Sequence, residues 1–460
     1  MNQIDFPYYQ EVAYIDPFQL FARFAKQEGA ILFDSSRLTK GLGCYSFIAI
    51  DPFLIIRDTE SSNHNSFGAL TKQLARYRLS TIPTLPPFQG GVAGYFGYDL
   101  CRQLERIPPH HHNDLQFPNL ILGFYDLIIS FDHQQKRSWI ISSGYPEQSP
   151  EKRQTRASKR LQWLLNKLAE KYDQLLLSAA ICSEQQILSN FTQSAYEQAV
   201  KKIIHYIYEG DVYEVNIAQR FQTTLSSEFS PFELYRRLRA FNSAPFSVFM
   251  NFSDVTLASA SPERFLQLIN KQVEARPIKG TRPRGKTTKE DQRLANELSQ
   301  SEKDRAENIM IVDLLRNDLS KVCENSSIQV PQLCGLESYA TVHHLVSVIQ
   351  GRLKKNYQAV DLLKAAFPCG SVTCAPKIRA MEIIAEIESH SRGPYCGAMG
   401  YIGFNGDMDM AVTIRTFAIK NNVITFHAGG AIVADSDPTE EYEETLVKAA
   451  ALRQALVEIF

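Results

Sequence analysis

The sequence predicts a mixed fold, with strands in the first third of the chain and helices alternating with strands afterwards. Apolar runs rich in β-branched and aromatic residues occupy 30–33, 44–50 and 120–131, and glycine, proline or aspartate breaks them. Leucines at 161, 164, 165 and 168 recur at helical spacing among charged residues. Periodicity alone supports only this mixed α/β composition.

The elements expected after residue 190 are longer and better bounded. We expect a helix over 196–208, with Ser194 as a possible N-cap. The charged stretch 287–321 predicts one long helix or a pair of helices. Strands are expected at 398–404, 409–419 and 423–433, and a helix from about 438 to 460. The change of pattern divides the chain into an N-terminal region (1–150), a helical connection (150–190) and a second region (190–460).

Composition excludes several classes of function. The formal net charge is −1, so the chain lacks the basic excess of a nucleic-acid binder. The longest apolar stretch, 120–131, is too short to span a bilayer and contains Asp126, so we expect no membrane span. Met1–Gln10 has no secretory signal, and the eight cysteines are scattered without a zinc pattern. These features favour a reduced, cytoplasmic setting.

One candidate site pairs a carboxyl group with an amine. Glu263 and Lys279 stand at the ends of two short apolar runs, and a hairpin would bring them together. Such a pair in a cleft can serve as general acid and nucleophile, provided that burial adjusts both pKa values. A surface salt bridge is the simpler alternative from spacing alone.

Two further segments offer carboxylates at helical spacing. Asp304 and Glu307 share one helix face, as do Glu441 and Glu444. Carboxylates from two helices, together with a substrate anion, make a typical Mg²⁺ site, since Mg²⁺ uses few protein oxygens. The alternative is an acidic helix start that complements the helix dipole.

A fourth segment places an arginine among apolar residues. Arg415 lies in an expected strand, and a buried arginine is costly unless it meets an anion. Gly429 and Gly430 would let backbone N–H groups approach a second carboxylate. A structural pair between Arg415 and a buried acid is an equal alternative.

Together, in this order, these segments resemble the chorismate-utilising enzymes: anthranilate synthase component I, aminodeoxychorismate synthase component I, and the isochorismate and salicylate synthases. The resemblance covers nearly the whole chain and is densest over 190–450. It implies an α+β fold, a large, mainly antiparallel β-sandwich flanked by helices, with both chain regions interleaved. Region 1–150 would match the N-terminal part of anthranilate synthase component I, and 190–460 would be the chorismate-binding catalytic region.

The resemblance also implies a role for each candidate residue. Glu263 would protonate the leaving C4 hydroxyl group of chorismate. Glu307 and Glu444 would bind Mg²⁺, with Asp304 and Glu441 reaching the ion through water. The groups that would hold the substrate carboxylates are Tyr395, Arg415 and Lys448 with the backbone of Gly429 and Gly430, and His344 would lie near the C4 side of the ring.

Position 279 discriminates within the family. The segment Pro277–Thr281 resembles the aminodeoxychorismate synthases, whereas the other members resemble Pro-Ile-Ala-Gly-Thr there. A neutral lysine amine can add at C2 as the C4 hydroxyl leaves; ammonia then adds at C4 and expels the lysine. This implies an amino-group transfer of the transaminase type that serves 4-aminobenzoate and folate synthesis. The alternatives are anthranilate synthase component I and a non-catalytic chorismate- or tryptophan-binding regulator.

Glu214 stands where the water-adding members carry a catalytic lysine, which argues against isochorismate chemistry, and the sequence alone gives it no catalytic role. The chain shows no amidotransferase nucleophile, so the resemblance implies a separate glutamine amidotransferase subunit as the ammonia source. Residues 33–36 do not match the tryptophan-feedback motif of anthranilate synthases.

Overall fold

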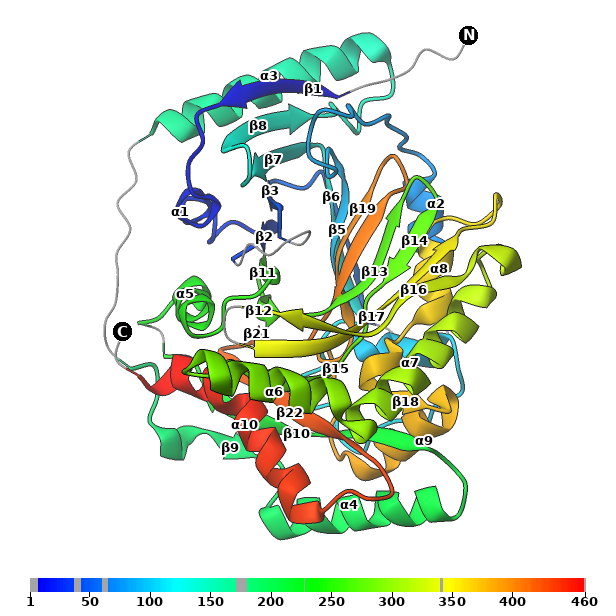
Figure 1. The fold of residues 1–460 in the computed structure, drawn as a ribbon. Coiled ribbons are helices and arrows are strands. Elements are labelled where there is room, and N and C mark those ends of the chain that lie inside the picture. The colour runs from blue at the N-terminus through cyan, green and yellow to red at the C-terminus, as the bar shows by residue number, and fades with distance from the viewer. Residues whose placement is uncertain are drawn as a thin grey trace.

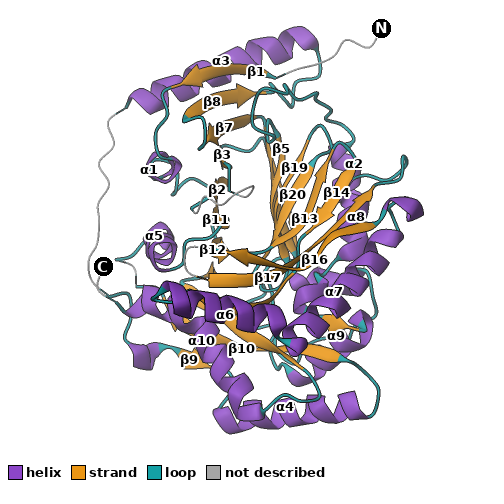
Figure 2. Ribbon diagram, viewed as in Figure 1, coloured by secondary structure: helices purple, strands orange, loops and turns teal. Residues whose placement is uncertain are grey.

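Two large β-sheets pack face to face, and helices cover their outer faces (Figures 1 and 2). The structure is a computed structural model that describes residues 7–36, 43–59, 65–170, 180–226, 228–339 and 342–458. All pairings between the named strands are antiparallel, which confirms the expected α+β sandwich.

The larger sheet has twelve strands within the described residues, and it draws them from both ends of the chain. Its order is β1 (Tyr8–Val12), β8 (Arg137–Ser142), β7 (Leu127–Asp132), β3 (Tyr45–Ala49), β2 (Ala30–Asp34), β11 (Phe246–Phe252), β12 (Val255–Ser261), β21 (Thr416–Lys420), β22 (Val423–Ile432), β10 (Glu214–Thr224) and β18 (Cys374–Ala375), with β9 (Leu188–Ser189) also pairing with β10.

The smaller sheet has ten strands in the described part of the chain and is interleaved in the same way. Its order is β15 (Ile278–Pro283), β17 (Val342–Arg352), β14 (Gln272–Ala275), β13 (Arg264–Ile269), β20 (Met408–Val412), β19 (Ala398–Gly403), β5 (Gly91–Phe96), β6 (Leu120–Tyr125) and β4 (Leu54–Asp58), and β16 (Gln329–Ser338) pairs with β17.

The helices begin at recognisable caps. Asp437, for example, accepts hydrogen bonds from the backbone N–H groups of residues 439 and 440, and Pro438 follows it at the first helical position. The α-helices of the described residues are α1 (Pro17–Phe21), α2 (Ser66–Leu74), α3 (Pro150–Ala169), α4 (Gln193–Tyr208), α5 (Pro231–Phe241), α6 (Thr288–Gln300), α7 (Glu302–Ser320), α8 (Ala359–Ala366), α9 (Lys377–Ile387) and α10 (Pro438–Val457), and four 3₁₀ turns are η1 (Tyr98–Gln103), η2 (Glu184–Gln186), η3 (Asn325–Ser327) and η4 (Gly370–Val372).

Apolar layers hold the sandwich together. Side chains such as Met250 and Tyr95 fill the layer between the two sheets. A second layer lies between the larger sheet and α1, α5 and α10, and a third between the smaller sheet and α2, α7 and α8. Figure 1 shows these helices outside the sheets, so the sheet-to-sheet layer is closed on both sides.

Several expected elements differ in detail. The stretch 287–321 is a pair of helices, because Ser301 ends α6 and its side chain caps α7. Thr192, and not Ser194, caps α4. The expected strand 409–419 is wrong as a single element, since β20 ends at Val412 in the smaller sheet and β21 starts at Thr416 in the larger one.

One buried ion pair ties several elements together. Arg392 and Glu388 are 1% and 2% exposed, and their side chains meet at 2.7 Å. Arg392 also donates to the backbone oxygens of Asn216 in β10 and Val372 in η4, while Glu388 accepts from the N–H of Ala218. The pair therefore joins β10, η4 and the end of α9.

We expect Glu388→Gln to lower the free energy of unfolding by about 3 kcal/mol or more, because it leaves the buried Arg392 charge without compensation. Asp313→Asn is the matched control, since it removes a carboxylate from an exposed pair with Arg316 and should cost less than about 1 kcal/mol. Urea unfolding measures both changes. Equal midpoints for the two variants would contradict the structural role of this pair.

None of the helices in the described residues combines the length and the apolar character that crossing a bilayer requires.

Candidate functional site

The site lies where the chain passes from one sheet to the other. Glu263 falls between β12 of the larger sheet and β13 of the smaller sheet, and residues 413–415 fall between β20 and β21. The two passages lie side by side: the Val412 N–H donates to the Glu263 carbonyl oxygen at 3.1 Å, and the Ala260 N–H donates to that of Arg415 at 3.1 Å. The seam between the sheets thus positions two of the expected residues.

Glu263 is buried, and its surroundings favour the protonated carboxyl group. It is 5% exposed, and its Oε1 has no hydrogen-bond partner among the described residues. Burial raises the pKa of Glu263 to about 7, against the opposing effects of a hydrogen bond from Ser371 and the charge of Lys279. The β13–β14 hairpin carries the chain from Glu263 back towards Lys279, as the spacing predicted.

Lys279 lies in β15 with its amine held by acids. Its Nζ is 2.6 Å from Oε1 of Glu214 and 4.0 Å from Oε2 of Glu307. Burial by itself would lower the pKa of Lys279, but the charge of Glu214 raises it well above its ordinary value. Glu214 therefore favours the charged amine, whereas the sequence interpretation required a neutral amine at the moment of reaction.

Glu214 is the residue that sequence reasoning set aside, and it is central to this contact. Its side chain is buried, and its Oε1 also accepts a hydrogen bond from the Cys374 thiol at 2.8 Å. Cys374 has a φ of 79°, a left-handed conformation that is strained for a residue with a side chain. Glu214 and Cys374 are 160 residues apart in the chain, so no local pattern could reveal their contact.

The expected metal carboxylates stand on two helices. Glu307 is on α7, and burial raises its pKa to about 7. Glu444 is on α10 with Glu441, whose Oε2 is enclosed without a partner among the described residues. A Cβ on Gly430 would lie 2.9 Å from Glu441 Oε2 and 3.5 Å from Glu444 Oε1, so this glycine leaves room beside both carboxylates.

Arg415 and Tyr395 are the next two expected residues. Arg415 is not in a strand, as expected from sequence, but in the 413–415 passage with a φ of 50°. Its guanidinium donates to Oδ1 of Asn242 at 3.3 Å. The Tyr395 ring stacks on His427 with 4.7 Å between ring centroids, and burial lowers the pKa of His427 well below its ordinary value.

The remaining expected residues have partners of their own. His344 in β17 faces Thr281 of β15, with 2.8 Å between His344 Nδ1 and Thr281 Oγ1. Lys448 contacts Glu444 at 2.6 Å and donates to the carbonyl oxygen of Gly429 at 2.9 Å. Lys448 extends from α10, and its amine lies between the Glu444 carboxylate and the Gly429 carbonyl oxygen.

Sequence reasoning missed several polar side chains of this site. They have enclosed atoms without a partner among the described residues, which is rare in folded proteins unless a ligand or water completes them. They are Glu214 Oε2, Asn216 Oδ1, Asn242 Nδ2 and Thr413 Oγ1, in addition to Glu263 Oε1 and Glu441 Oε2. Asparagine and threonine carry no recognisable spacing here, so only the fold could identify them.

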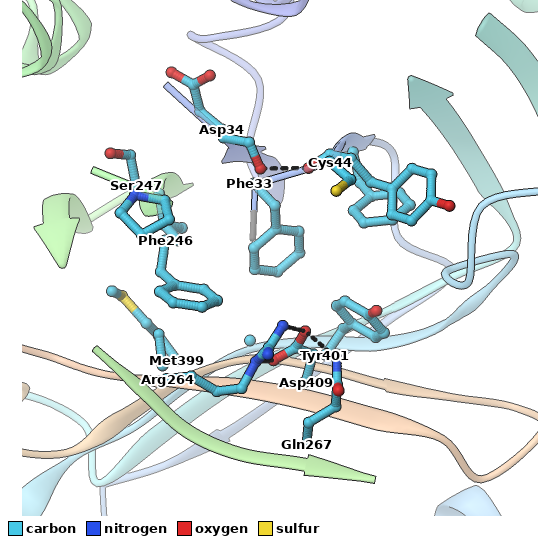
Figure 3. A pocket seen from close by; sticks show the side chains of 18 of the residues that line it. Phe33, Asp34, Cys44, Phe246, Ser247, Arg264, Gln267, Met399, Tyr401 and Asp409 are labelled. Atoms are coloured by element: carbon cyan, nitrogen blue, oxygen red, sulfur yellow. Dashed lines mark hydrogen bonds and ion pairs between the residues drawn. The ribbon is translucent and has the colours of Figure 1, made fainter. Parts of the chain in front are cut away.

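A cavity of about 200 Å³ lies between the sheets (Figure 3). Phe33, Phe246 and Tyr401 form its apolar walls, and Arg264 pairs with Asp409 on its floor at 3.0 Å. The segment 242–248 borders this cavity through residues 245–248. The same segment borders, through residues 242–245, a smaller cavity of about 60 Å³ that is also lined by Arg415 and His344.

Comparison with known proteins identifies the family. The model for chorismate binding enzymes matches residues 29–454. Aminodeoxychorismate synthase component 1 of Salmonella typhimurium is 42% identical, over 79% of this chain and 76% of that protein. Anthranilate synthase component 1 of Thermus thermophilus is 40% identical, over 82% of this chain and 80% of that protein.

A solved structure supports the same relationship. Anthranilate synthase component I of Streptococcus pneumoniae superposes with a TM-score of 0.80 at 31% identity, covering 91% of this chain and 94% of that chain. The fold and the family match therefore agree over nearly the full length. The chain belongs to the family of chorismate binding enzymes.

Proposed function

We propose that the protein converts chorismate and ammonia into 4-amino-4-deoxychorismate. The observation that carries this choice is the buried amine of Lys279, held beside the acid Glu263 and facing the carboxylates of α7. Relatives named aminodeoxychorismate synthase and anthranilate synthase match the chain about equally well, so overall similarity does not decide between them. A lysine nucleophile at position 279 does, because only the first reaction needs it.

The first half-reaction forms a bond between Lys279 and C2 of the ring. The Lys279 ammonium gives a proton to Glu214, 2.6 Å away, and the neutral amine adds at C2. The ring double bonds shift, the C4–O bond breaks, and Glu263 donates its proton so that water leaves. The raised pKa of Glu263, about 7, suits an acid that must be protonated beforehand.

In the second half-reaction the ring double bonds shift back. Ammonia adds at C4, the C2–N bond breaks, and its electron pair returns to the Lys279 nitrogen. Lys279 recovers a proton from Glu214, and Glu263 recovers one from the new C4 ammonium group. The sum is chorismate plus ammonia giving aminodeoxychorismate plus water, and the enol-pyruvyl group stays on the ring.

The residues present suit a Mg²⁺ ion. Glu307 and Glu444 would hold it, with Asp304 and Glu441 reaching it through water. Burial disfavours the charged form of Glu307, and Glu441 Oε2 is unpartnered among the described residues, so a divalent cation would compensate both. The described residues hold no group of three or more histidine, cysteine, aspartate or glutamate side chains that could bind a metal by themselves, so substrate and water oxygens would have to complete the coordination. When bound, Mg²⁺ would neutralise and orient the ring carboxylate.

Two sets of groups would hold the substrate carboxylates. Arg415 and Tyr395 suit one carboxylate, and the backbone N–H groups of Gly429 and Gly430, with Lys448, suit the other. His344 would lie by the C4 side of the ring.

We further propose that ammonia comes from a separate glutamine amidotransferase subunit and that a separate lyase releases pyruvate. We also propose that the protein works in the cytoplasm.

The second candidate is anthranilate synthesis, which the Thermus thermophilus relative favours. Incubation with chorismate, Mg²⁺ and ammonium should give aminodeoxychorismate, identified by chromatography and mass spectrometry, because the reaction ends before pyruvate is lost. Fluorescent anthranilate formed without an added lyase would overturn the proposal. Chorismate binding with no turnover at high ammonium would instead indicate a non-catalytic regulator.

Replacing Lys279 with alanine should reduce the rate of aminodeoxychorismate formation on the order of 100-fold or more, because the covalent route is lost. Lys289→Ala, on the exposed face of α6, removes the same group away from the site and should keep the wild-type rate. Mass spectrometry after acid quenching should find a chorismate-derived adduct on Lys279 in the wild type only. A wild-type rate for Lys279→Ala would exclude the nucleophilic role.

The pH dependence should report the Glu263 acid. Its pKa of about 7 lies above the ordinary value, so the protonated form is present at low pH and is lost as the pH rises through about 7. Ser371→Ala removes a hydrogen bond that stabilises the carboxylate, and should move this midpoint upwards. Infrared difference spectra against Glu263→Gln measure it through the acid carbonyl band. A midpoint near that of an exposed glutamate would contradict the assignment.

A further inference from the structure

Asn242 is held in place immediately after helix α5. Its backbone N–H donates to the Leu238 carbonyl oxygen at 2.8 Å and closes the helix. Its side chain lies against the passage between the sheets, where Oδ1 accepts a hydrogen bond from the Arg415 guanidinium at 3.3 Å. Asn242, Arg415 and His344 line the same small cavity. A fixed amide therefore stands beside a residue that we expect to bind substrate.

Arg415 differs from three arginines that are paired inside the protein. Arg237, Arg264 and Arg392 each pair with a carboxylate, at 3.1, 3.0 and 2.7 Å. In the described part of the chain no carboxylate pairs with Arg415, and burial lowers its pKa. Arg415 is half-buried, and a partly desolvated cation without a counter-charge is costly, so the arrangement favours an anionic ligand. The neutral amide of Asn242 holds the guanidinium without neutralising it.

The amide also has an unused donor. A guanidinium only donates hydrogen bonds, so the amide must turn its oxygen towards Arg415 and its nitrogen away. Asn242 Nδ2 is enclosed and has no partner among the described residues. An aspartate here could accept from Arg415 but could not donate, and an alanine could do neither.

We propose that Asn242 is a positioning residue for substrate binding: its oxygen orients Arg415, and its Nδ2 donates to the same substrate carboxylate. This inference rests on the proposed function, in that chorismate supplies the carboxylate. Asn242 favours the binding of an anion because it places a hydrogen-bond donor beside Arg415 and carries no negative charge. Closing α5 requires only the backbone of Asn242, so this role belongs to its side chain.

Asn242→Asp tests the proposal with almost no change in shape. The new carboxylate would pair with Arg415 and repel the substrate carboxylate, so the KM for chorismate, and its Kd measured by calorimetry with Mg²⁺ and no ammonium, should rise about tenfold or more. The KM for ammonium should stay near that of the wild type, because Arg415 does not hold ammonia. Asn242→Ala, which loses both hydrogen bonds and adds no charge, should weaken chorismate binding less.

Asn296→Asp is the matched control, since it adds the same charge on the exposed face of α6 and should leave both KM values unchanged. Wild-type affinity of Asn242→Asp for chorismate would overturn the inference. If that variant does not fold, Asn242→Ala decides, and unchanged affinity there would overturn the inference equally. Aminodeoxychorismate formation by the wild type keeps the proposed function standing in either case, whereas a wild type that does not bind chorismate would refute both.

Discussion

The geometry of the site depends on the buried pair of Arg392 and Glu388. Through it β10, η4 and the end of α9 share one set of hydrogen bonds, and the Arg392 guanidinium also lies over the rings of Tyr98 and Tyr395. Tyr98 belongs to the N-terminal region and Tyr395 to the candidate site. The pair therefore helps to fix the ring of Tyr395, which we propose binds substrate, relative to both regions of the chain, and its own charges are compensated without solvent.

Several candidate site residues lie where the regular strands are interrupted. Glu263 and Arg415 lie in the two short passages between sheets, and Cys374, beside Glu214, has a left-handed backbone. A strand would alternate its side chains between a packed layer and the opposite face, which leaves little choice of direction. Residues in the passages do not follow this alternation, while the sheets on both sides still hold their backbone. Enclosed polar groups from the two passages can therefore point into the same space.

Local signals carried much of the fold and part of the site. The sequence pattern predicted β22 to within one residue and the start of α10, because both depend on neighbours in the chain. The break at 413–415 was missed because it arises from pairing with β12, about 155 residues away. The contact of Lys279 with Glu214 is equally non-local. The family resemblance predicted Glu263 and Lys279 for one site, yet only the fold revealed which carboxylate holds the lysine amine and which amide stands beside Arg415.

Interleaving of the two chain regions has a consequence for biosynthesis. β5 pairs with β19 and β2 pairs with β11, so strands from the first hundred residues wait for partners made much later. Within the described residues β22, at 423–432, is the strand that joins β10 to the rest of the larger sheet. During synthesis on the ribosome the edges of β2 and β5 therefore stay unpaired until these later strands have been made, and such long-range pairing favours slow folding and a need for protection from aggregation.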